Sequence, residues 1–175
     1  MSFPPPTLVS RSGRLTLVPP SRENDSFVAA LRSHPDTRCH IPSFLAVFTE
    51  DDARALRLKR ADDPTRITFH IHLSKSAGAF VGTASITHID TTRKSCDIGI
   101  LVSAEYARGG YATEAIHALL EYIFEERKWH RVAFSTAVSN IAMRGWLDMA
   151  GTIHEGTLRG AWPLAHGDGF LDVCL

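Results

Sequence analysis

The sequence predicts a mixed α/β domain, and three observations lead to that fold class. Apolar and polar residues alternate over 66–73, 79–89 and 95–102, which predicts an antiparallel meander of three strands. The stretch 113–129 repeats apolar residues at helical spacing and predicts the longest helix. Strands and helices alternate after it, and a chain of 175 residues that is 44% hydrophobic fits one domain of this class.

The elements before the meander follow from proline positions and capping signals. Residues 1–12 are rich in proline and serine and are expected to form a flexible arm, which leaves 13–175 as a single domain. Thr49 precedes three acidic residues and predicts a helix start, because its hydroxyl accepts from free N–H groups and acids favour the first turn. The expected elements here are a strand at 14–18, a helix at 25–32, a loop at 35–48 and a helix from Thr49 to about Arg60.

The elements after the meander begin with a glycine-containing loop at 106–112, which leads into the long helix. Glu114 lies in the first turn of that helix, where an acid suits the macrodipole, and we interpret it as structural. The remaining expected elements are a strand at 131–138, a helix from Asn140 to Ala150 that stops at Gly151, and strands at 152–158 and 169–174 around a loop with Trp162 and Pro163.

The composition excludes several classes of function. The chain has 19 basic and 19 acidic residues, and this balance argues against broad electrostatic binding of nucleic acid or anionic membranes. No run of about 18 apolar residues is present. The three cysteines lie far apart and form no CxxC pair, so no metal site is expected. Free thiols and a start without a secretory signal predict a cytoplasmic protein.

The loop between the third meander strand and the long helix carries the strongest functional signal. Gly109 and Gly110 allow the backbone to turn with N–H groups pointing inward and permit close approach of a phosphate. The helix that follows adds its free N–H groups and positive dipole end, and Arg108 adds a charged donor. No Gly-Lys-Ser/Thr follows and no G-x-G-x-x-G is present, which excludes the Walker-type and Rossmann phosphate loops.

The run DIGILVSAEYARGGYATEA, residues 97–115, resembles the acyl-CoA-binding core of the GNAT N-acetyltransferases. It is most similar to the Rim-type branch of ribosomal-protein N-terminal acetyltransferases, which often shows an acidic residue-Ile-Gly strand and then Gly-Tyr-Ala-Thr-Glu-Ala. A second segment resembles the family's Asn-helix-Gly pattern through Asn140, Arg144, Leu147 and Gly151.

The resemblance implies a mostly antiparallel mixed sheet, flanked by helices, whose fourth and fifth strands splay apart. By the match these strands are 97–102 and 131–138, and the pantetheine arm of acetyl-CoA would pair with the first of them. Main-chain N–H near Leu101 or Val102 would polarise the thioester carbonyl. The residues implied in holding CoA are Leu101, Val102, Ala107, Arg108, Gly109, Gly110, Tyr111, Ala112, Thr113, Asn140 and Arg144.

The sequence departs from the family pattern at four positions. Ala107 stands where the family has Gln or Arg, Met143 where a serine is frequent, and Thr152 where a phenylalanine follows the glycine. Leu147 stands where a tyrosine often protonates the leaving thiolate. No obvious general acid remains in that helix. The thiol that leaves has a pKa of about 8.5, so it can depart as a thiolate without full protonation, and the missing acid need not abolish catalysis.

A general base is needed because the attacking amine must be neutral. Asp97 is the first candidate, with a strand-edge carboxylate paired with Arg or Lys as the alternative, and His88 on the preceding strand is the second candidate. His70 and His72 share one strand face and are interpreted as a sheet-face pair. The loop residues Phe44 and Trp162 could line an acceptor pocket.

These observations together predict an acetyl-CoA-dependent N-acetyltransferase, in which a primary amine attacks the thioester directly within a ternary complex. The acceptor is a small molecule or a protein N-terminus, and homodimerisation is left open. The alternative is a catalytically weak acyl-CoA-binding or sensing domain of the same fold, which the residues Ala107, Met143 and Leu147 would favour.

Overall fold

The computed structural model describes residues 5–75 and 78–175 and contains two sheets. The first sheet has six strands in the order β1-β2-β3-β4-β5-β6, and all neighbours are antiparallel except β5 and β6. Its strands are β1 (Leu8–Val9), β2 (Leu15–Val18), β3 (Ile67–Leu73), β4 (Phe80–Asp90), β5 (Ser95–Val102) and β6 (Arg131–Ala133). The second sheet has the order β7-β9-β8, formed by β7 (Thr136–Ala137), β8 (Thr157–Pro163) and β9 (Phe170–Cys174).

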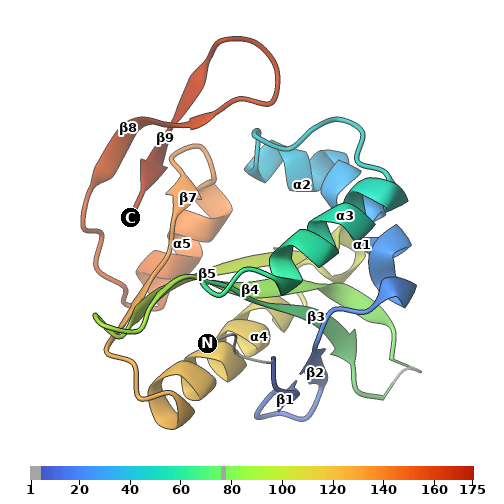
Figure 1. The fold of residues 1–175 in the computed structure, drawn as a ribbon. Helices are drawn as coiled ribbons and strands as arrows, with labels where there is room; N and C mark the ends of the chain where they lie inside the picture. The colour runs from blue at the N-terminus through green and yellow to red at the C-terminus, as the bar shows by residue number, and fades with distance from the viewer. Residues whose placement is uncertain (1–4, 76–77) are drawn as a thin grey trace.

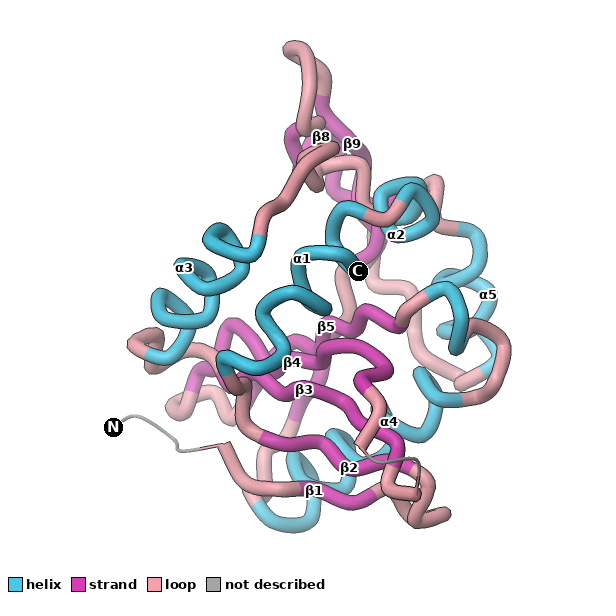
Figure 2. Tube along the Cα trace, turned by 90° about the vertical axis from the view of Figure 1, so that its right-hand side faces the viewer, coloured by secondary structure: helices cyan, strands magenta, loops and turns pink. Residues whose placement is uncertain are grey.

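Helices cover both faces of the first sheet, as Figure 1 shows. The helices are α1 (Asp25–Ser33), α2 (Pro35–His40), α3 (Glu50–Ala61), α4 (Tyr111–Glu121) and α5 (Ile141–Met149). Helices α1 and α3 pack on one face, against β4 and β3, and α4 packs on the other, against β2, β4 and β5. The tube view in Figure 2 shows strands β1 to β5 side by side in that order. This mixed α/β architecture confirms the predicted fold class.

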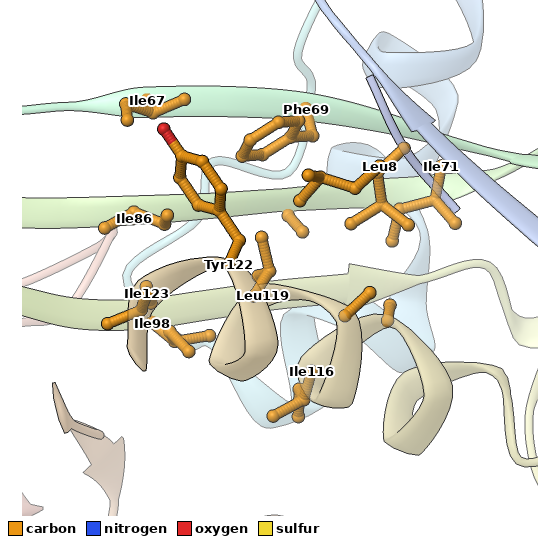
Figure 3. Packing of buried hydrophobic residues seen from close by; sticks show 14 of the residues in the cluster. Leu8, Ile67, Phe69, Ile71, Ile86, Ile98, Ile116, Leu119, Tyr122 and Ile123 are labelled. Carbon is orange, nitrogen blue, oxygen red and sulfur yellow. The ribbon is translucent and has the colours of Figure 1, made fainter. Parts of the chain in front are cut away.

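The main core lies between the first sheet and α4, and Figure 3 shows its packing. Leu119 and Ile123 of the predicted apolar stripe are fully buried against strand residues such as Phe69 and Ile86. The helix therefore buries the face that its spacing predicts. It begins at Tyr111, two residues before the expected start, and its last turn at Tyr122–Glu126 is a π-helix. No helix in the described ranges is long and apolar enough to cross a membrane.

Local capping explains why α3 and α5 begin where they do. The Thr49 hydroxyl accepts from the Asp52 N–H, and the Asp52 carboxylate accepts from the Thr49 N–H, which completes a capping box. The Asn140 side chain accepts from the Met143 N–H, and Gly151 follows α5 with φ of 75°. The sequence-based prediction of both caps is confirmed.

Four expectations about the elements need correction. The region 35–48 is not a continuous loop, because Pro35 at the first turn and the His34 side chain as cap start the short helix α2. Part of the expected flexible arm is ordered, because Leu8 and Val9 form β1 and pair with β2, and the Leu8 side chain is buried in the core. Residues 1–4 of the expected arm lie outside the described residues. The strand expected at 152–158 runs instead over Thr157–Pro163, so Trp162 and Pro163 belong to β8.

The fourth correction concerns the single strand expected at 131–138, which is divided between the two sheets. Its first part is β6, which pairs with β5, and its second part is β7, which pairs with β9. Phe134 and Ser135 connect the two parts. The chain therefore leaves the first sheet after Ala133, and this departure creates the candidate site.

Candidate active site

The first sheet opens at its β5 edge. β5 and β6 pair in parallel only from Ser95 with Arg131 to Asp97 with Ala133. Beyond Asp97, β5 continues to Val102 along β4, while the chain of β6 turns away into the second sheet. The strands expected to splay are therefore the ones that separate, with Asp97 at the point of divergence.

The register of β4 and β5 decides which main-chain groups face this opening. The Ser103 N–H donates to the Val81 carbonyl at 2.9 Å, so Ser103 turns its main chain toward β4. Alternation along a strand gives Leu101 the same direction, and gives Ile100 and Val102 the opposite one, toward the opening. A Cβ built on Gly82 would lie only 2.0 Å from the Leu101 carbonyl oxygen, in agreement with this direction.

This geometry corrects one predicted catalytic residue. Leu101 points its main chain into the β4 ladder, so its N–H is not placed to polarise a carbonyl in the opening. Val102, the other predicted donor, and Ile100, which the sequence analysis missed, turn theirs to the open edge. Strand alternation alone could not identify them, because it does not show which neighbour each face meets.

The glycine loop after β5 adopts a turn with two left-handed residues. Arg108 has φ of 61° and Gly110, the residue before α4, has φ of 78°. Gly109 is required for a different reason, because a Cβ there would lie 2.5 Å from the Tyr111 ring. The side chain of Arg108 is exposed. The two glycines thus serve distinct purposes, one conformational and one steric.

Main-chain N–H groups remain available across this loop. Ala107 and Gly109 donate to the carbonyls of Ala104 and Tyr106, and the first helical bond of α4 runs from Glu114 to Gly110. Within the described ranges, no hydrogen-bond acceptor is found for the N–H groups of Arg108, Gly110, Tyr111, Ala112 and Thr113. An array of free N–H groups at a helix N-terminus fits an anion such as the diphosphate of CoA.

Arg14, the residue directly before β2, contacts the glycine loop and the start of α4. Its guanidinium donates to the Gly109 carbonyl at 2.8 Å, lies over the Tyr111 ring at 4.6 Å and forms an ion pair with Glu114 at 2.7 Å. Glu114 also accepts from the Ser10 hydroxyl. Its carboxylate is therefore held by the N-terminal strands, which confirms its predicted structural role. Arg14 was not identified from the sequence, since its contacts are distant along the chain.

Helix α5 packs against the start of α4. The Trp146 indole N–H donates to the Thr113 hydroxyl at 2.9 Å, which fixes the two helices to each other. Asn140 accepts with its side-chain oxygen and keeps its amide N–H groups for another partner. Arg144 donates to the Val138 carbonyl at 3.0 Å and lines a separate pocket of about 310 Å³ beside β6. Its guanidinium is thus already engaged in holding the β7–α5 connection.

The two candidate general bases form one hydrogen-bonded pair. His88 Nδ1 donates to Asp97 Oδ2 at 2.8 Å, and the imidazole is largely exposed. A register shift between Thr87 and Asp90 and a φ of 50° at His88 bring the ring over the neighbouring strand. A carboxylate that accepts from Nδ1 fixes the tautomer in which Nε2 is free to accept a proton. The partner of Asp97 among the described residues is thus His88, and not the Arg or Lys of the alternative interpretation.

The other predicted residues lie in different surroundings. His70 and His72 both accept from the Asn24 amide, at 3.0 and 3.1 Å, as a sheet-face pair. Phe44 lies under the Arg32 guanidinium at 3.8 Å. Leu147 and Met143 are half-buried on α5 and offer no proton donor.

Comparison with known proteins agrees with this geometry. The family model for the acetyltransferase (GNAT) domain matches residues 14–152. The FsC-acetyl coenzyme A-N(2)-transacetylase of Aspergillus fumigatus is 28% identical over 160 residues, which cover 87% of this chain and 67% of that protein. YdaF of Bacillus subtilis, named as a candidate ribosomal N-acetyltransferase, is 32% identical over 82 residues, 47% of this chain. That match spans 45% of the length of YdaF.

Solved structures show the same fold. A GNAT-family acetyltransferase from Bacillus anthracis is 25% identical, covers 97% of this chain and 95% of its own, and superposes with a TM-score of 0.79. The spermidine N-acetyltransferase of Vibrio cholerae, solved in complex with CoA and spermine, is 20% identical and also has a TM-score of 0.79. It covers 92% of each chain.

Proposed function

Because the chain belongs to the GNAT acetyltransferase family, whose members use acetyl-CoA, we propose that it transfers the acetyl group of acetyl-CoA to a primary amine by direct attack in a ternary complex. The observation that carries this proposal is the set of free N–H groups of Arg108, Thr113 and three residues between them, beside an open strand edge. The set includes Gly110, Tyr111 and Ala112.

The loop would bind the diphosphate through its main chain. The N–H groups and the positive end of α4 stabilise negative charge without a basic cluster, which suits a chain of zero net charge. This explains why Ala107, in place of the family's Gln or Arg, is compatible with binding. Arg108 adds one charged donor from the exposed side.

The open edge of β5 would orient the pantetheine arm and the thioester. Ile100 and Val102 present main-chain groups to which the amides of pantetheine can pair as an added strand. One of these N–H groups would donate to the thioester oxygen and stabilise the negative charge that develops there. The free amide N–H groups of Asn140, at the start of α5, would add a contact from the opposite wall.

His88 would remove a proton from the attacking amine. The amine nitrogen attacks the carbonyl carbon, the carbon–sulfur bond breaks, and the proton passes to His88 Nε2 while Asp97 holds the ring. Asp97 is the last residue of β5 that pairs with β6, so the pair lies where the strands begin to separate. CoA leaves as a thiolate, which does not need the acid that Leu147 and Met143 lack.

The relatives differ in the acceptor that their names indicate: a ribosomal protein, an N(2) amine and a polyamine. The acceptor proposed for this chain is accordingly the class they share, a primary amine on a small molecule or a protein N-terminus. The net charge of zero gives no steering toward strongly charged acceptors.

The test measures CoA thiol released from acetyl-CoA with a panel of primary amines, beside calorimetry with acetyl-CoA alone. Binding with turnover on at least one amine is expected. Binding without turnover across peptides, polyamines and amino acids would instead favour the acyl-CoA-binding domain, for which the absent acid at Leu147 is the supporting observation. Neither binding nor turnover would contradict both functions.

A further inference from the structure

A second cavity lies on the α1 and α3 side of the first sheet. Its volume is about 220 Å³, which equals the volume that about seven molecules occupy in liquid water, at roughly 30 Å³ each. The floor is formed by Thr68 and His70 of β3 and Thr83 of β4, and α1 and α3 form the roof. Apolar side chains from the same helices, including Val28 and Leu56, line one part of it.

The walls of this cavity carry an excess of positive charge. Arg32, Arg57, Arg60 and Arg66 all line it, against the single carboxylate of Asp25. The Arg57 guanidinium donates a hydrogen bond to each oxygen of that carboxylate, at 2.8 and 2.9 Å. Arg66 forms an ion pair with Asp63, with 3.5 Å between Arg66 Nε and Asp63 Oδ2.

Arg32 and Arg60 form no ion pair with an acidic side chain in residues 5–75 and 78–175. Burial lowers the pKa of Arg32 to about 10. Burial together with the charges of Arg66 and Arg32 lowers the pKa of Arg60 to about 10, against the opposing charge of Asp63. The cavity thus confines two cations that disfavour each other.

Two polar atoms in the walls also lack partners. The Arg32 Nε and the Thr68 Oγ1 are inaccessible to solvent and have no hydrogen-bond partner among the described residues. The Arg32 guanidinium lies over the rings of Phe44 and Phe48, at 3.8 and 4.7 Å, which hold its plane in place. Because a guanidinium stacks by its face, its donors point outward in that plane. Polar atoms this deeply buried are normally satisfied, so this part of the cavity wall is poor in hydrogen-bond partners.

We propose that this cavity is a binding site for a small organic anion, a carboxylate or phosphate carried on a compact apolar body. The guanidinium groups of Arg32 and Arg60 would bind the anionic group. The apolar body would pack on Val28 and Leu56.

The site is distinct from the opening at β5. The apolar cluster that contains Val28 and Ala53 of the cavity lining also contains Phe80, and Leu101 of β5 packs against it. Thr83, on the cavity floor, pairs with Leu101 in the β4–β5 register. A bound anion would therefore contact β4, one strand away from the open edge, and not the acetyl-CoA loop.

The test uses benzoate as the anion, benzamide as its uncharged analogue and inorganic phosphate as the anion without an apolar body. Calorimetry on the full chain, without acetyl-CoA or amine, is expected to show benzoate binding at least tenfold tighter than benzamide and tighter than phosphate. Because no transfer reaction is involved, failure here leaves the proposed function standing.

Variants locate the binding. Arg60→Gln is expected to weaken benzoate binding roughly 10- to 100-fold, the value of a charged hydrogen bond, and Arg32→Gln by a similar factor. Lys59→Gln removes the same charge from the exposed neighbouring position on α3 and is expected to leave binding unchanged.

Three results would overturn the proposal. They are no benzoate binding, equal binding of benzamide, and equal weakening by Lys59→Gln and Arg60→Gln, which would indicate diffuse attraction only. In the active enzyme, inhibition by benzoate that is competitive with the amine would also contradict a separate site. Arg32→Gln removes the second cation of the cavity, so it keeps the test decisive if Arg60→Gln fails to fold.

Discussion

The imidazole of His88 owes its position to one irregular residue in β4. Its φ of 50° belongs to the left-handed region, which costs a non-glycine residue on the order of 1 kcal/mol. That cost is consistent with a functional position, because the resulting conformation brings Nδ1 to 2.8 Å from Asp97.

His88→Gln is expected to lower kcat about 100-fold or more and to leave KM for acetyl-CoA unchanged, because it removes the proton acceptor and no cofactor contact. Asp97→Asn is expected to lower kcat less, since the imidazole remains but its tautomer is no longer fixed. Steady-state kinetics with a saturating amine measure both effects. His117→Gln, at an exposed position on α4, serves as the control. Full activity of His88→Gln would exclude the imidazole as the base.

Single residues were predictable from sequence where local rules decide their role. Thr49 and Asn140 are caps because a side-chain oxygen followed by free N–H groups is a local arrangement. Asp97 and His88 were each identified, but not as a pair, because a strand pattern of period two does not show a bulge. Arg14 was missed because its partners lie about a hundred residues away.

The glycine loop and α5 each contain a glycine that tests a different physical rule. Gly110→Ala is expected to destabilise the fold by about 1 kcal/mol and to weaken acetyl-CoA binding, because φ of 78° disfavours a Cβ and the loop would shift its N–H groups. Gly145→Ala is expected to stabilise by roughly 0.5–1 kcal/mol, since this position is helical and a Cβ there has nothing within 4 Å.

Denaturant unfolding and calorimetry with acetyl-CoA measure the two variants side by side. Gly145→Ala should retain wild-type affinity for acetyl-CoA, so it controls for a general effect of an added methyl group. Unchanged affinity in Gly110→Ala would show that the main-chain conformation of the loop does not bind the diphosphate.

The elements that sequence reasoning assigned correctly are those with a clear period or cap. β5 runs over the predicted residues 95–102, and α3 differs from its prediction by a residue at each end. The strand expected at 131–138 has the right period but is divided, because the division depends on which strands lie beside each half. Helix α2 was missed because six residues with mixed polarity carry no measurable apolar stripe.

At the scale of the whole molecule, function depends on two sheets that share one interrupted strand. β6 keeps the chain against β5 up to Ala133, and β7 then joins β9 and β8, which Figure 1 shows beside the first sheet. The resemblance of residues 97–115 to the GNAT family implied this splay, whereas periodicity could not. The arginine-lined cavity was not foreseen at all, because α1, α3 and β3 contribute to it from separate parts of the sequence.

We propose that the free main-chain N–H groups of Arg108 and of residues 110–113 bind the diphosphate of acetyl-CoA. Amide-resolved NMR of the protein titrated with CoA measures these groups directly. The largest chemical-shift changes are expected at the amides of Arg108 and 110–113, with smaller changes at Ile100 and Val102. The proposal would be contradicted if CoA bound while those loop amides stayed unchanged, or if the largest shifts lay elsewhere in the chain.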